Sequence, residues 1–247
     1  MRYAQTVRKT PLKKKFRILL FRHGEAWHNV GRFDGTHDCY ITLTNLGLQQ
    51  AHKLGEFLYY FVRNEGVDLR TARLWTSPFV RAVETAQTVR EYLPFSEVRQ
   101  DFCLREKDFG IFQWSPYEDW HNIDLQSFEH FNRCEEAGAK ILAGVPLGES
   151  VAQMIDRTRP FSGTLARDRD YRGIESAFVS GHGWSNRGVA FNTLHQDLDA
   201  IEKSTNPENC AVRYILAEQE ERELIIDNRI RRIRSYKYRD MGYIYKG

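Results

Sequence analysis

Two histidines of the 247-residue chain stand directly after short apolar runs. Arg22-His23-Gly24-Glu25 follows residues 16–21, and Ser180-Gly181-His182-Gly183 follows residues 177–179. A neutral imidazole is a competent nucleophile that can carry a covalent intermediate. The guanidinium beside the first histidine offers a planar pair of donors that suits phosphate oxygens. These residue types indicate nucleophilic chemistry on a phosphate group. For each motif taken alone, the alternative is a surface turn with solvated charges.

A third short run, residues 73–76, also ends in a polar turn, Ser77-Pro78, and Arg81 follows about one helical turn later. A lone histidine is more often a structural residue than a catalytic one. Two histidines and two arginines that all lie just past predicted strand ends are harder to explain separately. The pattern therefore favours one shared site.

The surrounding sequence predicts the elements that would position these residues. Continuous apolar runs predict buried strands at residues 16–21, 73–76 and 177–179. Helical periodicity follows each of them. Thr44 is the expected N-cap of a helix that ends near Gly66, and two further helices are expected over about 80–93 and 185–194. This alternation predicts an α/β fold of three layers, α/β/α, with a mainly parallel central sheet. Such sheets bind ligands beyond the carboxyl ends of their strands.

The remaining segments complete the expected organisation. Two late runs, 211–216 and 223–226, are separated by the acidic segment 218–222, which predicts a hairpin between them. Residues 111–147 mix aromatic with acidic and amide side chains and are interpreted as a helical insertion over the site. We expect a single domain over 1–247, with a core at about 16–227 and basic ends at 1–15 and 228–247.

Composition limits the classes of protein that the chain can belong to. Hydrophobic residues make up 41% and charged residues 28%, as in soluble globular proteins. The net charge is +3, but residues 18–227 hold 22 basic and 32 acidic residues, a net charge of −10. This distribution argues against a nucleic-acid binder and favours an acidic exterior around a cationic pocket. The two basic ends are interpreted as solvated tails or packing strands, and the alternative is a contact with an acidic partner.

The sequence also carries expectations about location. No stretch reaches the 18 apolar residues of a membrane-spanning helix, and the basic N-terminus lacks the apolar run of a signal peptide. The four cysteines form no C-x-x-C pair, and there is no N-x-[ST] sequon. These features favour a reducing, cytoplasmic location without a disulfide framework or a zinc site.

At this point the sequence, over about residues 16–227, resembles the histidine phosphatase superfamily, also called phosphoglycerate-mutase-like. Six motifs occur in the order of that family. They are Arg22-His23-Gly24-Glu25 with Asn29, Leu43-Thr44-Asn45-Leu46-Gly47-Leu48-Gln49-Gln50-Ala51, Ser77-Pro78-Phe79-Val80-Arg81-Ala82-Val83-Glu84-Thr85-Ala86, Leu104-Arg105-Glu106-Lys107-Asp108-Phe109-Gly110, Gly148-Glu149-Ser150, and Ser180-Gly181-His182-Gly183.

The resemblance implies a phosphohistidine mechanism. His23 would attack phosphorus, and water would then cleave the intermediate. Arg22, Arg81 and a protonated His182 would hold the non-bridging oxygens, and Asn29 would add a neutral donor. Glu106 would protonate the leaving alkoxide and then activate water, although a solvated loop acid is the alternative for this residue. Gly183 and Trp184 complete the expected binding residues. The resemblance implies no metal and no cofactor.

Residues around the expected pocket separate phosphatase from mutase. After the acid, the phosphoglycerate mutases carry Y-G-x-L-x-G-L-N-K and a later arginine pair, whereas this chain reads Gly110-Ile111-Phe112-Gln113-Trp114-Ser115-Pro116 with no such pair before Gly148. This difference favours a metal-independent phosphomonoesterase, similar to broad-specificity or acid phosphatases. Mutase-type phosphoryl transfer and a non-catalytic phosphate-binding scaffold remain the alternatives.

Aromatic residues suggest the kind of substrate. Trp27, Phe112, Trp114 and Trp184 could line the site as an aromatic wall, or each could pack in the core. If two or more line the site, a small phosphorylated substrate with an apolar or aromatic leaving group is expected. The sequence leaves open whether that substrate is a sugar phosphate, phosphoprotein, nucleotide or lipid phosphate, and it leaves the oligomeric state open.

Overall fold

The computed structural model of the chain describes residues 14–32, 36–113, 115–226 and 229–247. Its centre is a six-stranded sheet with the order β3-β2-β4-β1-β5-β6. The strands are β1 (Lys15–Arg22), β2 (Ala72–Thr76), β3 (Val98–Gln100), β4 (Ser176–Gly181), β5 (Val212–Ile226) and β6 (Arg229–Tyr245). The first four in the sheet order pair in parallel, whereas β5 pairs antiparallel with both β1 and β6.

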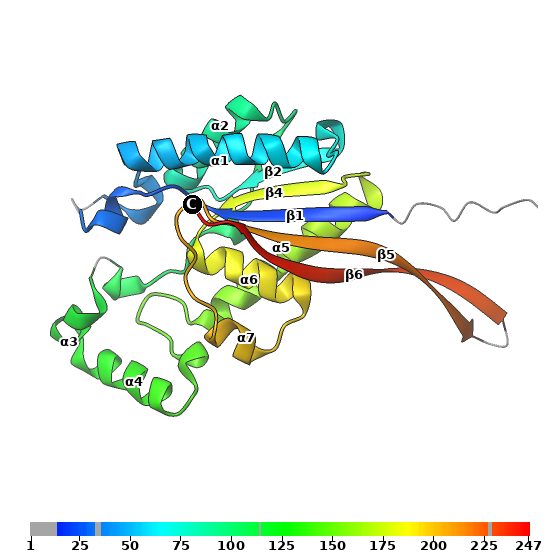
Figure 1. Cartoon of the computed structure of the whole chain (residues 1–247). Coiled ribbons are helices and arrows are strands. Elements are labelled where there is room, and N and C mark those ends of the chain that lie inside the picture. The colour runs from blue at the N-terminus through cyan, green and yellow to red at the C-terminus, as the bar shows by residue number, and fades with distance from the viewer. Residues whose placement is uncertain (1–13, 33–35, 114, 227–228) are drawn as a thin grey trace, which may run out of the picture.

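Helices cover both faces of this sheet (Figure 1). Within the described residues they are α1 (Asn45–Asn64), α2 (Val80–Tyr92), α3 (Trp120–Ile123), α4 (Leu125–Glu136), α5 (Val151–Tyr171), α6 (Gly183–Leu194) and α7 (Leu198–Glu202). In Figure 1, α1 and α2 lie above the sheet, and α5, α6 and α7 lie below it. The expected three-layer α/β/α fold with a mainly parallel sheet is therefore confirmed.

The central strand β1 shows why the sheet needs cover on both faces. Phe16, Ile18 and Leu20 pack with residues of α5 and α6, such as Phe161. Leu19 and Phe21 point to the opposite face and pack with residues of α1 and α2. Because successive side chains alternate between the faces, an unbroken apolar run is buried only when both faces are covered.

The first long helix begins as its sequence predicts. The Thr44 hydroxyl accepts a hydrogen bond from the backbone N–H of Gly47 at 3.0 Å, which makes Thr44 the N-cap of α1. Apolar positions such as Ala51, Leu54 and Leu58 then face the sheet and are buried. The helix ends at Asn64, just before Gly66.

The prediction of a hairpin inside residues 211–226 is wrong. Both late apolar runs and the acidic segment between them belong to one strand, β5, and the partner strand is β6, formed by the basic C-terminal end. The register places Glu218 opposite Lys237, and the Glu218 carboxylate forms an ion pair with Arg239 at 2.9 Å. Opposite charges on facing strands stabilise such pairs, so a run of acids is compatible with a strand when its partner is basic.

The β5–β6 hairpin is longer than the rest of the sheet. Lys15 at the beginning of β1 pairs with Glu218, and β5 continues to Ile226. At about 3.3 Å per residue, the eight residues after Glu218 carry the hairpin roughly 26 Å beyond the start of β1. Figure 1 shows this projection at the right, whereas α3 and α4 lie at the left of the molecule.

The segment predicted as a helical insertion contains α3, α4 and several short 3₁₀ helices. Its own small core stacks Phe112 on Trp120, with ring centroids 4.4 Å apart, and Phe131 packs against the edge of Trp120. Both Phe112 and Trp120 are buried. The aromatic richness of this segment is explained in large part by this packing.

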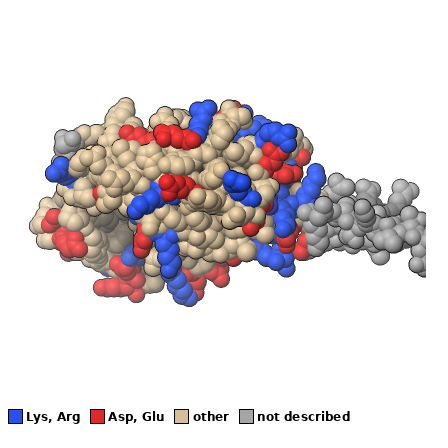
Figure 2. Space-filling model, turned by 45° about the horizontal axis from the view of Figure 1, so that its top comes forward, with Lys and Arg blue, Asp and Glu red and all other residues tan. Residues whose placement is uncertain are grey.

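The surface and the chain ends bear on the charge analysis. On the face shown in Figure 2, basic and acidic side chains are interspersed, so the negative charge of residues 18–227 does not form a continuous acidic surface there. Residues 1–13 of the predicted basic N-terminal end lie outside the described residues. Among the helices that the structure describes, none is long and apolar enough to cross a membrane.

Candidate active site

The candidate site lies at the carboxyl edge of the parallel strands. His23 follows β1, Ser77 follows β2 and His182 follows β4. Parallel neighbouring strands end at the same edge of a sheet, so residues far apart in the sequence meet here. The imidazole centroids of His23 and His182 are 5.1 Å apart. The structure thus brings together the two histidines that the sequence singled out.

The turn after β1 requires two glycines. A Cβ on Gly24 would lie 2.3 Å from the carbonyl oxygen of Gly47, and a Cβ on Gly47 would lie 1.9 Å from the carbonyl oxygen of Glu25. The backbone after His23 therefore packs directly against the first turn of α1. This contact fixes the position of the histidine that precedes it.

The hydrogen bonds of His23 determine which ring nitrogen is free to react. Nδ1 lies 2.6 Å from the carbonyl oxygen of Gly24, which can only accept, so Nδ1 carries the proton. Nε2 is then the nitrogen with the lone pair, and it accepts from Nε–H of Arg81 at 3.3 Å. Burial, followed by the charges of Arg81, His182, Arg22 and His28, holds the pKa of His23 well below its ordinary value of 6.5. His23 is therefore a neutral imidazole with a lone pair on Nε2.

Arg81 is almost completely buried and has a carboxylate partner. Its Nη1 lies 2.8 Å from Oδ1 of Asp38 and donates to the Asp38 carbonyl oxygen at 2.7 Å. Nη2 contacts the second carboxylate oxygen at 3.3 Å. The guanidinium is thus held between Asp38 and His23. Asp38 was not among the residues predicted from the sequence, because it reaches the site through tertiary folding of a short 3₁₀ helix, Asp38–Tyr40.

A cavity of about 730 Å³ opens beside these groups. Arg22 lines it, anchored by a 2.7 Å hydrogen bond from Nη1 to the carbonyl oxygen of Pro207. The other lining residues are His28, Asn29, Gly31, Asp38, Arg81, Glu106, Phe109, Gln113, Ser115, Pro116, Trp184 and Asn206. Two guanidinium groups therefore face a space large enough for a small phosphorylated molecule.

His28 is a third histidine of the site, and sequence reasoning missed it. Its ring centroid lies 5.6 Å from that of His23, and its buried Nδ1 has no hydrogen-bond partner among the described residues. Burial and the neighbouring Arg81 and Arg22 lower its pKa to about 3. His28 is therefore a neutral imidazole. It lies three residues after the end of the Arg22-His23-Gly24-Glu25 motif, where no pattern gave it a separate signal.

His182 contacts the turn after β2. Its Nε2 lies 2.8 Å from the Ser77 hydroxyl, while its buried Nδ1 has no partner among the described residues. Burial, with the charges of Arg81, His28 and Arg22, holds the pKa of His182 well below 6.5. These neighbours favour the neutral form of His182, whereas the sequence analysis expects the protonated form as a phosphate donor. A bound phosphate would work in the opposite direction, because a nearby anion favours the charged imidazole.

Glu106 faces the cavity from an irregular segment between two short 3₁₀ helices. Its Oε1 accepts from the backbone N–H groups of Lys107 at 2.8 Å, Trp184 at 3.1 Å and Ser185 at 3.3 Å. Trp184 and Ser185 are in the first turn of α6, where a helix favours a negative charge. Burial nevertheless outweighs these hydrogen bonds and raises the pKa of Glu106 above 4.5. A carboxyl group with these properties is suited to proton transfer.

The other expected binding residues differ in their relation to the cavity. Asn29 lines it and accepts from the backbone N–H of Ala26 at 3.0 Å. Trp184 also lines it, and its indole is stacked on the Arg187 guanidinium at 3.5 Å. Gly183 is not among the lining residues, and a Cβ there would lie 1.9 Å from the side-chain oxygen of Asn206. Gly183 therefore permits close packing at the start of α6.

The predicted aromatic wall is only partly present. Phe112 is buried in the small core of the insertion, and Trp27 lines a different cavity, beneath Arg32. Trp114 lies outside the described residues. Trp184 does line the site, together with Phe109, which was not predicted. The remaining aromatic residues pack elsewhere because the insertion needs a core of its own.

A second cavity of about 320 Å³ adjoins the first and shares Asp38, Glu106 and Gln113 with it. Lys107 lines it and is almost fully buried, with its ammonium 4.0 Å from the centre of the Phe109 ring. Burial lowers the pKa of Lys107 to about 8. Glu106 therefore lines both cavities. Within the described residues, no group of three or more His, Cys, Asp or Glu side chains could hold a metal ion.

Comparison with known proteins places these features in a family context. The sequence model of the histidine phosphatase superfamily (branch 1) matches residues 18–228. A phosphoglycerate mutase-like protein of Arabidopsis thaliana, AT74, is 28% identical over 213 residues, which is 80% of this chain and 63% of that protein. An acid phosphatase of Mycobacterium tuberculosis is 27% identical over 179 residues, 71% of this chain and 74% of that protein. The chain thus spans less than two thirds of the length of the first relative.

Solved structures show the same fold. A mycobacterial glucosyl-3-phosphoglycerate phosphatase superposes with a TM-score of 0.67 over 93% of this chain and 99% of the other, at 20% sequence identity. A likeness at this level of identity concerns the arrangement of helices and strands.

Proposed function

The chain belongs to the histidine phosphatase superfamily (branch 1), and from this premise we propose that it is a phosphomonoesterase that works through a phosphohistidine on His23. The observation that carries the proposal is the environment of His23 Nε2. This nitrogen has a lone pair, accepts from Nε–H of Arg81 at 3.3 Å and lies in the same buried cluster as His182. A nucleophile is thus held beside the groups that would bind the phosphoryl oxygens.

In the first step, Nε2 of His23 attacks phosphorus in line. The N–P bond forms as the bond from phosphorus to the ester oxygen breaks. Arg22 and Arg81 hold the non-bridging oxygens, because the transition state spreads negative charge over them. The phosphate takes over the Arg81 Nε–H that His23 Nε2 accepts, and the charge of the phosphate favours the protonated form of His182.

Glu106 supplies the proton for the leaving group. Its raised pKa keeps a proton available, and that proton passes to the ester oxygen as the bond breaks. In the second step, the Glu106 carboxylate accepts a proton from water, the water oxygen attacks phosphorus, and the N–P bond breaks. Free His23 and inorganic phosphate result. We propose that the reaction needs no metal ion, since the arginines supply the positive charge.

We also propose that the core and the insertion act as one domain. Gln113, Ser115 and Pro116 of the insertion line the same cavity as Arg22 and Arg81. The leaving group of a substrate would therefore contact the insertion while its phosphate contacts the sheet edge.

A phosphate-release screen tests the proposed function. Sugar phosphates, nucleotides, phosphopeptides, lipid phosphates and 3-phosphoglycerate are each incubated with the protein, with and without EDTA. We expect hydrolysis of at least one ester that EDTA does not abolish. A strict requirement for added metal would contradict the mechanism. Isomerisation of 3-phosphoglycerate faster than hydrolysis of any ester would establish the mutase alternative.

Trp184 offers a test of the leaving-group class. Its indole lines the cavity, so Trp184→Ala removes an aromatic contact worth about 1 kcal/mol beyond the buried area. We expect KM to rise about tenfold for aryl phosphates and less than about threefold for small alkyl phosphates. Trp27→Ala is the matched control, because its indole lines a different cavity. An equal loss for both classes of ester would argue against an aromatic leaving group.

A further inference from the structure

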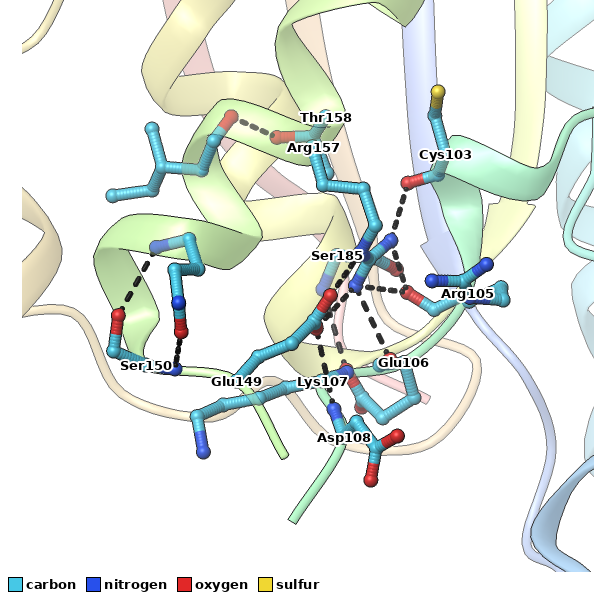
Figure 3. Close-up of polar contacts among 12 residues, drawn as sticks. Cys103, Arg105, Glu106, Lys107, Asp108, Glu149, Ser150, Arg157, Thr158 and Ser185 are labelled. Carbon is cyan, nitrogen blue, oxygen red and sulfur yellow. Dashed lines mark hydrogen bonds and ion pairs between the residues drawn. The ribbon is translucent and has the colours of Figure 1, made fainter. Parts of the chain in front are cut away.

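Arg157 of α5 is linked to the segment that carries Glu106 by an unusual number of hydrogen bonds (Figure 3). Its Nη1 donates to the carbonyl oxygens of Cys103 at 2.9 Å and Arg105 at 3.2 Å. Its Nη2 donates to those of Arg105 at 3.3 Å and Glu106 at 3.2 Å. One guanidinium thus donates to three backbone carbonyl groups, those of Cys103, Arg105 and Glu106.

The segment has little regular structure of its own. Arg105 and Glu106 lie between the 3₁₀ helices Phe102–Leu104 and Gly110–Phe112, so their carbonyl groups are outside any helix or strand, and Cys103 lies within the first of these short helices. Buried carbonyl groups need partners, and here a side chain supplies them. The backbone course at Glu106 therefore depends on Arg157.

Glu149 completes the arrangement. Its carboxylate receives Nε–H of Arg157 at 2.6 Å and Nη2–H at 2.9 Å, and it also accepts from the backbone N–H of Asp108 at 3.3 Å. Burial alone would raise the pKa of Glu149, but the hydrogen bonds from Arg157 outweigh it and the pKa lies below 4.5. Glu149 is thus a carboxylate, and the Arg157–Glu149 pair contacts the segment at both Cys103 and Asp108.

Helix α5, which carries Arg157, is held in place by its capped first turn and by its packing against the sheet. Ser150 caps its first turn by accepting from the N–H of Gln153, and Gln153 in turn accepts from the N–H of Ser150. Further along the helix, Phe161 and Leu165 are buried against the sheet. A planar guanidinium with five N–H donors can serve all these acceptors at once, whereas an ammonium group cannot.

We propose that Arg157 is a positioning residue for the reaction, which holds the Glu106 carboxyl group where it can donate its proton to the leaving oxygen. The proposal rests on the role given to Glu106 above. Without Arg157, the backbone of Cys103, Arg105 and Glu106 loses its shared donor, and the carboxyl group loses its fixed place. A displacement of about 1 Å in a catalytic group can lower the rate about 100-fold.

The test compares esters that do and do not need a proton donor. Single-turnover measurements follow phosphoenzyme formation from an alkyl phosphate, a poor leaving group, and from p-nitrophenyl phosphate, a good one. For Arg157→Met we expect a loss of about 100-fold with the alkyl ester and less than about threefold with the aryl ester. Arg157→Lys keeps the charge without the planar pair of donors, so we expect an intermediate loss that is again confined to the alkyl ester.

Arg73→Met is the matched control for general destabilisation. Arg73 forms a buried ion pair with Asp168, near the other end of α5, so its loss weakens the same helix without touching the Glu106 segment. We expect this variant to lower the melting temperature and to leave the alkyl-to-aryl ratio of rates unchanged. If Arg157→Met does not fold, the ratio for Arg157→Lys decides.

The outcomes separate this inference from the proposed function. Glu106→Gln is measured in parallel on both esters. A selective alkyl loss in Glu106→Gln but an equal loss with both esters in the Arg157 variants overturns the positioning role alone. If Glu106→Gln shows no selective loss with the alkyl ester, the acid role of Glu106 is overturned, and the positioning role of Arg157 fails with it.

Discussion

Replacement of His23 by alanine is expected to lower phosphate release by about four orders of magnitude or more, because removal of a catalytic nucleophile generally has an effect of that size. Nε2 of His23 is directed at Nε of Arg81, and its tautomer is fixed through the Gly24 carbonyl oxygen. The measurement is phosphate release from the best ester of the screen, together with trapping of an acid-labile, base-stable phosphoenzyme.

A matched control keeps this result interpretable. His52→Ala changes a half-exposed histidine of α1, which contacts Tyr92 away from the cavity, so it should leave both turnover and the phosphoenzyme unchanged. In His23→Ala, loss of the Nδ1 hydrogen bond costs about 1–3 kcal/mol of folding stability, which a melting curve will report. Turnover at the wild-type rate by a folded His23→Ala variant would exclude the phosphohistidine mechanism.

Replacement of Glu106 by glutamine should show the second largest effect. General acid catalysis contributes about 10²- to 10⁴-fold, so we expect kcat/KM for an alkyl phosphate to fall about 10³-fold and for p-nitrophenyl phosphate to fall much less. Glutamine keeps the size of the side chain and can still accept from the N–H groups of Lys107 and Trp184. The comparison therefore tests the proton and not the packing.

The pH profile supplies an independent measure of the same proton. The acid form of Glu106 is the active form in the first step, so kcat/KM falls as the pH rises through the pKa of Glu106. Burial places that pKa above 4.5, and the fall accordingly begins at a higher pH than an exposed glutamate would give. The wild-type protein and Glu106→Gln are compared on one ester, whose own ionisation then cancels. A limb of the profile that persists in Glu106→Gln would assign it to another group.

The sequence was informative wherever local pattern determines structure. The apolar run of β1 predicts a strand buried on both faces, and the parallel order of β1, β2 and β4 then brings His23 and His182 together at one edge. The position of Arg81 at this edge is predictable as well, because Arg81 lies in the first turn of the helix after β2. These predictions need only the periodicity of side chains and the rule that parallel strands share an edge.

Features that depend on distant partners could not be predicted in this way. Glu218 of the acidic segment lies within a strand, where Lys237 of β6 stands opposite it and Arg239 of β6 forms an ion pair with it. Asp38 and His28 reach Arg81 and His23 through the irregular segment after β1, whose course no local pattern specifies. The environment of Glu106 depends on N–H groups of α6 and on Arg157 of α5, which are 51 to 79 residues away in the sequence.

The long β5–β6 hairpin separates two ends of the molecule. Its projecting part lies at the amino end of β1, whereas the cavity lies at the carboxyl end of the same strand. A tether or a fluorescent label attached near residue 226 would therefore stand at the opposite end of the sheet from Glu106 and Arg22. Single molecules can therefore be immobilised through the β5–β6 hairpin, with the cavity facing away from the support.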